Sequence, residues 1–572
     1  MNLRALKIAT ACTVAGVAAV AAAPDASWAS APAPEPDRAG RVEGATVRTS
    51  LVPLATAYGT NGSAGSAAVG GRMIFSAETE SAGVEPWVTD GTPGGTHVLA
   101  DIRPGAEGSD PRHFVPFRGQ VYFFAETGPR SNALWRTDGT LSGTKVVREV
   151  PEATYLVRSG SRLFFIGFTT ERGAELWASD GTAAGTNEVT DLLPGPESGV
   201  NVEHQLVPTR AGVVFSGRAL VGVSKLWTSD GTAAGTQRLD AYPEGVDLQV
   251  GDFGVRGDRL VVAGGDARSG VELWGGGLLP GSVAGVKDIW EGTAGSHPRD
   301  FTPLGDEWLF TAADPAAGAE LFVTDGTSGG TAMVRDLRAG AQDSLPRNFV
   351  PAGARVFFEA AGPDADVVLW ATGGSAATTH PITLLTGIVD AYPAASLRNG
   401  GAVLVGVTGS GAPRIITTGA AATSALRIVQ NGAVRLPSKS SVDVLGQLGR
   451  LVVAGVYVPG GRSTIVAWST VSSRTTVPRR LVCRAGQRPH VRVAVRAAGL
   501  RPGGGTVLLE VAGRTVGRAT LRQGTATVRA RTTLRPGRYR FRAHWSGSIQ
   551  AAGSSSDAGV LRVLRSRSGS CS

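Results

Sequence analysis

Three cysteines, three methionines and an aromatic content of 6% make this chain of 572 residues poor in several residue types. So few cysteines exclude a disulfide-dense scaffold and leave no cluster for zinc or an iron–sulfur centre. Beyond the N-terminal residues, no stretch is long and apolar enough to span a membrane. Lysine is scarce beside arginine, which we attribute to GC-rich coding.

Glycine, in contrast, is abundant. The chain has 80 glycines and 32 prolines, while 42% of its residues are hydrophobic. This composition provides for real cores and for many tight turns, as in all-β proteins.

The N-terminus has the features of a secretory signal. Arg4 and Lys7 precede an apolar segment at 8–23, and a small-x-small site predicts cleavage after Ala29. A membrane anchor is disfavoured, because a span needs about 20 apolar residues. We therefore expect a signal peptide at 1–29, a Pro-rich linker at 30–45, and a secreted or cell-surface protein.

The small number of cysteines is compatible with an exported protein that contains one disulfide. Cys12 raises the alternative of a lipoprotein, but Ala9 stands where a large aliphatic residue is expected. Cleavage of the signal leaves Cys483 and Cys571, which are most simply one disulfide.

An internal repeat dominates the rest of the chain. Clear copies include ELWASDGTAAGT at 175–186 and ELFVTDGTSGGT at 320–331, and later copies decay. The recurring aromatic position returns every 48 residues or so. It is occupied by Trp87, Trp135, Trp177, Trp227, Trp274, Phe322 and Trp370, and then by Ile416 and Trp468.

Each unit contains four short apolar runs bounded by Gly, Pro or Asp, which is typical of β-strands. Four strands per 40–50 residues indicate a propeller blade. The second run recurs nine times, so residues 46–477 predict a propeller of eight to nine four-stranded blades. The ninth unit lacks an obvious fourth strand, and we expect residues 46–52 to complete it.

The DGTxxGT element predicts a turn. Its aspartate can accept the backbone N–H two residues on, and its glycine supplies a positive φ. The aromatic residue before it should fill the space between neighbouring blades. The turn aspartates are Asp90, Asp138, Asp180, Asp230 and Asp325.

These motifs resemble the bacterial ELWxxDGT repeat family, which is also grouped with hyalin-type repeats, over about residues 45–475. The resemblance implies an exported repeat protein and brings no catalytic residues.

The composition changes near residue 478. Residues 478–572 contain 19 arginines, no lysine and two acids, a net charge of +17 that leaves −8 for residues 1–477. Apolar residues alternate with arginine, which predicts half-buried antiparallel strands. Residues 517–556 resemble bacterial Ig-like repeat domains, which implies a stalk or adhesion module. The expected fold is thus all-β, a propeller followed by a C-terminal Ig-like β-sandwich.

Candidate chemistry is sparse. Residues 326–330 match G-x-S-x-G, but Ser328 falls in the repeat turn. The turn aspartates could bind calcium, yet no copy has the ligand density of a D-x-D-x-D-G loop. The seven histidines show no metal spacing. We identify no catalytic, metal or cofactor residue, although two carboxylates for glycosidase chemistry need only meet in space.

The sequence therefore favours a non-enzymatic binding or scaffold protein with an unidentified protein or glycan partner. The arginine-rich module suggests attraction to anionic envelope material, such as acidic wall glycans, lipid headgroups or extracellular DNA. Sequence-specific nucleic-acid binding is not expected. The alternative is an extracellular polysaccharide-active enzyme with acids in the propeller channel.

Overall fold

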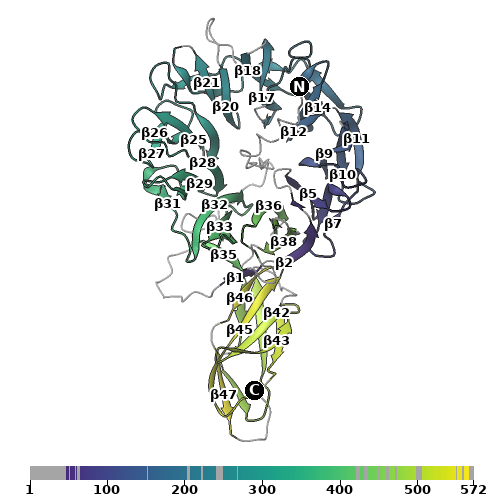
Figure 1. Ribbon diagram of the computed structural model, residues 1–572, viewed down its shortest axis with the longest axis vertical. Coiled ribbons are helices and arrows are strands. Elements are labelled where there is room, and N and C mark those ends of the chain that lie inside the picture. The colour runs from purple at the N-terminus through teal and green to yellow at the C-terminus, as the bar shows by residue number, and fades with distance from the viewer. Residues whose placement is uncertain are drawn as a thin grey trace, which may run out of the picture.

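Nine antiparallel units of four strands follow one another around a ring, and a β-sandwich extends from one edge of the ring (Figure 1). This computed structural model describes residues 47–565 except 51, 58, 61–64, 130, 151, 203–205, 221–222, 240–248, 267, 420–425, 431–435, 437, 449–450, 459–462, 470–472, 479, 498–505, 532, 549–550 and 557–558. The predicted signal peptide and linker lie outside these residues. No helix in the described part of the chain is long and apolar enough to cross a membrane.

The ring is a nine-bladed propeller, as the nine copies of the second strand predict. Blades one to three are β4 (Ser66–Val69), β5 (Arg72–Thr79), β6 (Gly83–Thr89) and β7 (His97–Val98), with β3 (Gly59–Thr60) also on β5; β8 (Arg112–Phe117), β9 (Gln120–Gly128), β10 (Ser131–Thr137) and β11 (Lys145–Val150); and β12 (Ala153–Ser159), β13 (Arg162–Thr169), β14 (Gly173–Ser179) and β15 (Thr186–Thr190). Blades four to six are β16 (Val207–Pro208), β17 (Val213–Leu220), β18 (Val223–Ser229) and β19 (Gln237–Arg238); β20 (Gln249–Arg256), β21 (Arg259–Asp266), β22 (Gly270–Gly277) and β23 (Ala284–Lys287); and β24 (Arg299–Leu304), β25 (Glu307–Asp314), β26 (Gly318–Thr324) and β27 (Ala332–Arg335).

Blade seven is β28 (Arg347–Ala352), β29 (Arg355–Ala361), β30 (Val367–Thr372) and β31 (His380–Pro381), with a 3-10 helix at Ala376–Thr378. Blade eight is β32 (Ile388–Ser396), β33 (Ala402–Thr408), β34 (Pro413–Thr418) and β35 (Arg427–Gln430). Blade nine has β36 (Ser441–Leu448), β37 (Leu451–Tyr457) and β38 (Ser463–Ser469) as its first three strands.

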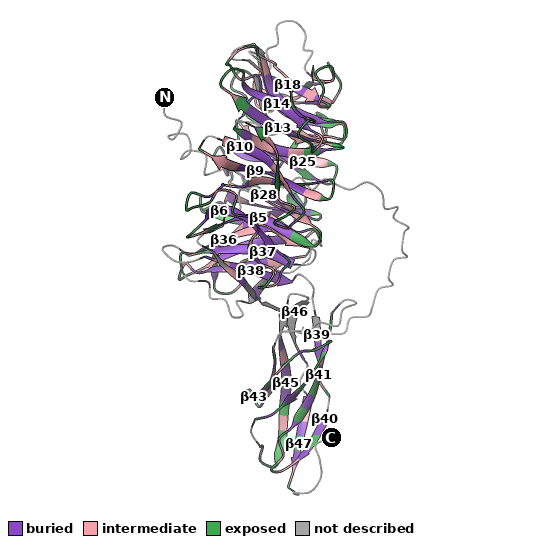
Figure 2. Cartoon of the chain, turned by 90° about the vertical axis from the view of Figure 1, so that its right-hand side faces the viewer, coloured by how far each residue is buried: buried purple, intermediate pink, exposed green. Residues whose placement is uncertain are grey.

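The first strand of each blade lies nearest the centre of the ring and the fourth lies at the rim (Figure 1). The second and third strands are continuous apolar runs, because both of their faces pack against neighbouring blades. In β5, for example, the five residues from Met73 to Ala77 are all buried. Figure 2 shows this buried material as bands through the ring.

The repeat aromatics form the seams between blades. Trp177 of blade three packs with Phe117, Tyr122 and Phe124 of blade two, and its ring stacks on Phe165 at 5.8 Å between centroids. The others contact the preceding blade in the same way, namely Trp87, Trp135, Trp227, Trp274, Phe322, Trp370 and Trp468.

An N-terminal strand completes blade nine, but not the predicted one. β2 (Val52–Ala57) runs antiparallel to β38, with Val52 opposite Ala467 and Ala57 opposite Ser463. The predicted segment, residues 46–52, lies about one strand too early. Four of its residues form β1 (Val47–Ser50), which pairs with β35 of blade eight and with β46 (Ala551–Ser555) of the sandwich, and only Val52 belongs to β2. The two consecutive segments have the same β-prone pattern, so the pattern did not fix which one closes the ring.

The C-terminal module is a sandwich of two sheets. One sheet has the order β43 (Arg514–Thr520), β42 (Thr506–Val511), β45 (Gly537–Ser548), β47 (Gly559–Leu564) and β40 (Arg480–Arg484), with β46 also on β45. The other is β39 (Ser473–Thr476), β41 (His490–Ala497) and β44 (Thr525–Arg529). Val493, Leu509, Phe541 and Trp545 are in the core between the two sheets.

The boundary predicted at residue 478 is a few residues late. β39 pairs with β41 of the sandwich, so the module begins by Ser473. Arginine enrichment, which set the predicted boundary, starts only after this first strand.

Candidate functional site

The repeat turn is closed by its own aspartate. Asp180 Oδ1 accepts hydrogen bonds from the backbone N–H of Thr182 at 2.8 Å and from the Thr182 hydroxyl at 2.7 Å. The Thr182 hydroxyl lowers the pKa of Asp180. Gly185 is required here, because a Cβ at this position would stand 2.1 Å from the same carboxylate. The same contacts recur at Asp90, Asp138, Asp230 and Asp325.

Each of these turn aspartates accepts its hydrogen bonds from residues of its own turn. Within the described ranges, no group of three or more His, Cys, Asp or Glu side chains lies close enough to hold a metal ion. Ser328 occupies the same turn in blade six, where its carbonyl accepts the N–H of Thr331 at 3.4 Å. That setting lacks the strand-to-helix elbow that a G-x-S-x-G nucleophile needs.

The turns also tie each blade to its neighbour. Arg72, at the start of β5, donates to the carbonyl of Gly139 in the turn of blade two at 2.9 Å. Arg162 makes the equivalent bond to Gly231 at 3.3 Å, from blade three to blade four. Hydrogen bonds from an arginine to a turn carbonyl fix both the turn and the seam.

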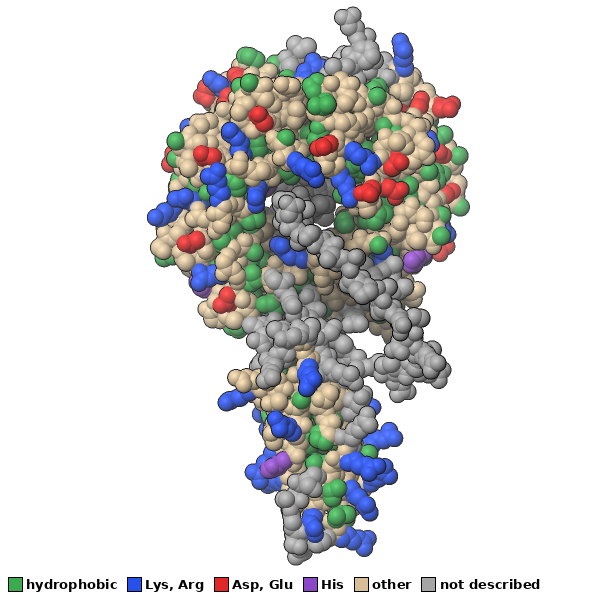
Figure 3. Space-filling view, turned by 180° about the vertical axis from the view of Figure 1, so that it is seen from behind, with side chains coloured by type: hydrophobic (Ala, Val, Ile, Leu, Met, Phe, Trp, Pro, Cys, Tyr) green, Lys and Arg blue, Asp and Glu red, His purple; other side chains and the backbone are tan. Residues whose placement is uncertain are grey.

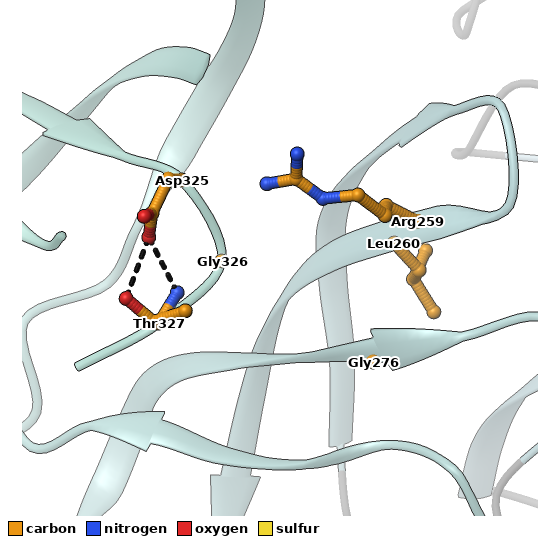
Figure 4. A pocket seen from close by; sticks show the side chains of 6 residues that line it. All are labelled: Arg259, Leu260, Gly276, Asp325, Gly326 and Thr327. Carbon is orange, nitrogen blue, oxygen red and sulfur yellow. Dashed lines mark hydrogen bonds between the residues drawn. The ribbon is translucent and has the colours of Figure 1, made fainter. Parts of the chain in front are cut away.

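A pocket of about 400 Å³ opens at the corresponding seam between blades five and six. Arg259 points across it toward the turn of Asp325 (Figure 4). The guanidinium nevertheless donates to the Asp306 carbonyl at 3.2 Å and lies 4.9 Å from the centroid of the Trp308 ring. Because its polar groups already hold the seam, we assign this pocket a structural role.

A second set of carboxylates, which the repeat pattern did not single out, is fully buried. The glutamate of the ELW motif is at most 2% exposed in four blades, as Glu85, Glu175, Glu272 and Glu320. Glu272 accepts four hydrogen bonds: from the N–H groups of Ile289, Trp290 and Ser296 at 2.8, 3.2 and 2.7 Å, and from the Ser296 hydroxyl at 2.6 Å. Each glutamate thus fastens the loop that leads into the next blade.

Burial raises the pKa of three of these acids, Glu85, Glu175 and Glu320. The pKa of Glu175 and that of Glu320 rise to about 7 for this reason, against the hydrogen bonds that lower them. The pKa of Glu85 is also raised by burial. A signal for these anchors was present in the sequence, because three of the four glutamates precede, by 24 residues, a serine in an S-x-P-R segment.

The fastened loops enter the innermost strands through a shared bulge. The segments SDPRHF at 109–114, SHPRDF at 296–301 and SLPRNF at 344–349 each interrupt the pairing with the second strand. The fifth residue of each has a positive φ: 57° at His113, 62° at Asp300 and 56° at Asn348. Bulges of this kind re-aim side chains and recur beside binding sites.

These bulges place polar groups of both signs at the inner edges of the blades. Asp252 of blade five accepts the N–H of Asp300 at 2.5 Å, and burial together with Asp252 raises the pKa of Asp300. In blade seven, Arg347 lies 3.8 Å from Glu359, which also accepts a hydrogen bond from Asn348.

His113 is neutral near physiological pH. Burial lowers its pKa to about 4, and its ring lies 6.2 Å from that of Tyr155, centroid to centroid, in the next blade. Its Nε2 is 3.3 Å from the Thr154 hydroxyl. This histidine therefore has aromatic and hydroxyl neighbours and no carboxylate partner among the contacts described.

The sandwich presents a strongly basic sheet. Cross-strand partners share a face, and the register of the five-stranded sheet places arginines from four strands on its outer face. Figure 3 shows basic side chains along the side of the module that faces away from the viewer of Figure 1. On the five-stranded sheet itself, Glu510 lies opposite Arg542. Within the described part of the module, the ion pair recorded joins Glu510 to His544 at 2.9 Å. The outward arginines are Arg480, Arg484, Arg518, Arg538, Arg540, Arg542 and Arg562.

No family model and no curated protein sequence matches this chain, so the two family resemblances stay predictions. Among solved structures, the chain is similar to prolyl oligopeptidase B from Galerina marginata at 10% identity and a TM-score of 0.36, over 69% of this chain and 57% of that one. It is also similar to an uncharacterized protein from Listeria monocytogenes EGD-e at 11% identity and a TM-score of 0.30, over 61% of this chain and 99% of that one. The matched region spans just over half of the prolyl oligopeptidase, and likenesses at this level concern the fold alone.

Proposed function

We propose that this protein is an exported, non-enzymatic binding or scaffold protein that adheres to anionic envelope material through its C-terminal sandwich. The propeller holds a loop-bearing face in a fixed shape, and the sandwich supplies the adhesion. Export rests on the N-terminal signal pattern and on the resemblance to exported repeat proteins.

The observation that carries the proposal is the excess of arginine over acidic residues in the sandwich. Arg538 and Arg562 lie directly opposite each other on neighbouring strands, and like charges in this position destabilise a sheet. Arg538, Arg540 and Arg542 follow one another on the outer face of β45, and all three are exposed. Such an array costs folding energy unless it meets an external anion, and guanidinium groups bind phosphate and carboxylate in a bidentate way.

The propeller is built to keep its loops rigid. The buried glutamates hold loops that would otherwise be mobile, and the bulges hold non-glycine residues in a strained conformation. Fixed polar groups at the inner edges of the blades are suited to recognising a polar ligand without reorganisation. This arrangement supports a binding role for the ring, with a protein or glycan as the partner.

The test is binding of the whole purified protein to immobilised anionic polymer over a range of ionic strengths. We expect retention at low salt and release as the screening length falls below about 10 Å above 0.1 M salt. A variant with Arg538, Arg540 and Arg562 changed to glutamine should elute at lower salt. Failure of the unaltered protein to bind any anionic polymer at low salt would overturn the proposal.

A second candidate is a polysaccharide-active enzyme. The observation that favours it is the pair Asp252 and Asp300, in which one carboxyl group has a raised pKa beside another that accepts two backbone N–H bonds. Glycosidases use carboxyl pairs with such divided properties. Release of reducing ends from acidic or neutral glycans, abolished in Asp300→Asn, would establish this role in place of the binding role.

A further inference from the structure

The outer face of the five-stranded sheet combines arginines with aliphatic side chains, and the two alternate on β40 and β47. Across β40, β47 and β45, Arg480 lies opposite Val560, which lies opposite Arg540. In the next row, Val482 lies opposite Arg562. On β40 and β47, cations and aliphatic groups therefore form a checkerboard, whereas β45 adds an unbroken row of arginines, Arg538, Arg540 and Arg542. We call the outer face of these three strands the checkerboard face.

The aliphatic positions are unusual for an exposed sheet face. Outward positions of a half-solvated antiparallel sheet are normally polar, yet Val482 is 37% exposed. Val560, Leu564 and Leu508 on the same face are half-buried. We call the three that lie on β40 and β47, namely Val482, Val560 and Leu564, the aliphatic positions of the checkerboard.

The opposite sheet of the same module provides an internal comparison. Its outward residues include the exposed arginines Arg492, Arg496 and Arg529. The register places Arg492 opposite Thr527, Arg529 opposite His490 and Arg496 opposite Arg474. Among its described residues, no large aliphatic side chain lies between these arginines on the outer face. The two faces share a basic character, and only the five-stranded one combines it with large aliphatic groups.

This combination of arginines and aliphatic groups restricts the kind of partner that the face can bind. A soluble polyanion needs the arginines alone and gains nothing from exposed valine and leucine. A second copy of this face would bring like charges together, which is unfavourable. A bilayer surface rich in anionic phospholipid uses both components, because phosphate groups bind arginine while aliphatic side chains enter the boundary between headgroups and acyl chains.

We propose that the checkerboard face docks onto an anionic phospholipid bilayer. The inference rests on the proposed function and names its partner. The guanidinium groups bind lipid phosphates, and the aliphatic positions enter the interface between them. Arginine suits this geometry, since its stem packs along apolar surface while its head reaches a phosphate.

The experiment uses the whole protein and sedimentation with vesicles of phosphatidylglycerol and phosphatidylcholine, with phosphatidylcholine vesicles and soluble polyphosphate as the other arms. One variant, R538Q/R540Q/R562Q, removes three charges from the checkerboard face. A matched variant, R492Q/R496Q/R529Q, removes three charges from the opposite sheet. A third, V482S/V560S, leaves the charge unchanged and removes two aliphatic groups.

Each arginine near an anionic surface contributes roughly fivefold in affinity, so R538Q/R540Q/R562Q should weaken vesicle binding by about a hundredfold. The matched variant should lose only a few-fold. V482S/V560S should bind the mixed vesicles several-fold more weakly and bind polyphosphate as the unaltered protein does. Far-ultraviolet circular dichroism and thermal melts establish that each variant is folded.

Binding to polyphosphate without binding to vesicles would overturn the bilayer inference and leave the proposed function standing. Equal losses in the two arginine variants, or an unchanged V482S/V560S, would likewise overturn it. If the protein binds neither anion, both proposals fail. If only the checkerboard arginine variant is unfolded, V482S/V560S decides the inference.

Discussion

Substitution of Glu272 by glutamine is expected to release the loop that joins blades five and six. The carboxylate accepts three backbone N–H bonds and one hydroxyl bond, two on each oxygen. The glutamine amide replaces one acceptor oxygen by a donor nitrogen. If that nitrogen takes the Oε2 position, the Ser296 hydroxyl can reverse its role, but the N–H of Ile289 cannot.

The expected loss of stability in Glu272→Gln follows from the number of hydrogen bonds that the carboxylate accepts. One buried N–H without a partner costs about 1–3 kcal/mol, and each remaining bond loses about 1 kcal/mol when its acceptor is no longer charged. We therefore expect the free energy of unfolding to fall by about 3–6 kcal/mol. Most of the loss should appear locally, as faster amide hydrogen exchange at Ile289 and Ser296.

Glu320 is the matched control. Its Oε2 accepts from the Leu337 N–H at 2.9 Å and the Ser344 hydroxyl at 2.7 Å, while its buried Oε1 has no hydrogen-bond partner among the described atoms. Glutamine can place its nitrogen at the Oε1 position without opposing any donor. Since its two hydrogen bonds each weaken by about 1 kcal/mol, Glu320→Gln should cost about 2 kcal/mol, less than Glu272→Gln.

The assay is urea unfolding combined with hydrogen exchange read out by mass spectrometry over residues 289–298 and 337–346. Equal losses of stability in the two variants would refute the reasoning, because the number of donors would then be irrelevant. Unchanged exchange at 289–298 in Glu272→Gln would refute the anchoring role itself.

Three further predictions concern stability. Burial raises the pKa of Glu175 and Glu320 from an ordinary 4.5 to about 7, so the native state keeps protons that the unfolded chain has released. Their contribution to the free energy of unfolding should therefore fall as pH rises from about 4.5 to 7. In urea melts at pH 5 and 8, the free energy of unfolding of a Glu175→Gln/Glu320→Gln variant should depend less on pH than that of the unaltered protein. An equal pH dependence in the variant and the unaltered protein would contradict this. Deletion of Val52–Ala57 should lower the melting temperature by several degrees, since β38 becomes an unpaired edge, whereas deletion of six residues from the Pro-rich segment at 31–40 should not. Thiol counting without reductant should find no free cysteine, because a Cys483–Cys571 bond would close a loop worth about 4–5 kcal/mol; Cys483 is buried, Cys571 lies outside the described residues, and two reactive thiols in the denatured protein would disprove the bond.

The sequence was most informative where interactions are local. The turn of Asp180 closes within six residues, so its spacing alone indicates the hydrogen bond and the glycine. The second strand of each blade is recognisable in the sequence as an apolar run, and nine such runs predict nine blades. These features depend on neighbours in the chain, and a repeat displays them many times.

Features that depend on distant neighbours were harder to predict. Glu272 finds its partners 17 to 24 residues away, and a lone glutamate before leucine has the appearance of an ordinary exposed position. Asp252 and Asp300 meet because adjacent blades bring their inner strands together, which no linear spacing encodes. The closing strand was displaced for a related reason, because its partner β38 lies some 400 residues further along the chain.

The seam between blades nine and one shows why closure differs from the other contacts of the ring. Arginines open the second strands of blades one, three, five and seven, and Arg72 and Arg162 bond to the turn of the following blade. At the closing seam, the side chain of Leu451 lies against Gly91 in the turn of blade one. The equivalent residue of blade nine, Arg450, lies outside the described residues. Blade nine is completed by strand β2, which pairs with β38. Ring closure is thus assigned to the backbone pairing of the N-terminal strand, which makes β2 the element whose loss should open the propeller first.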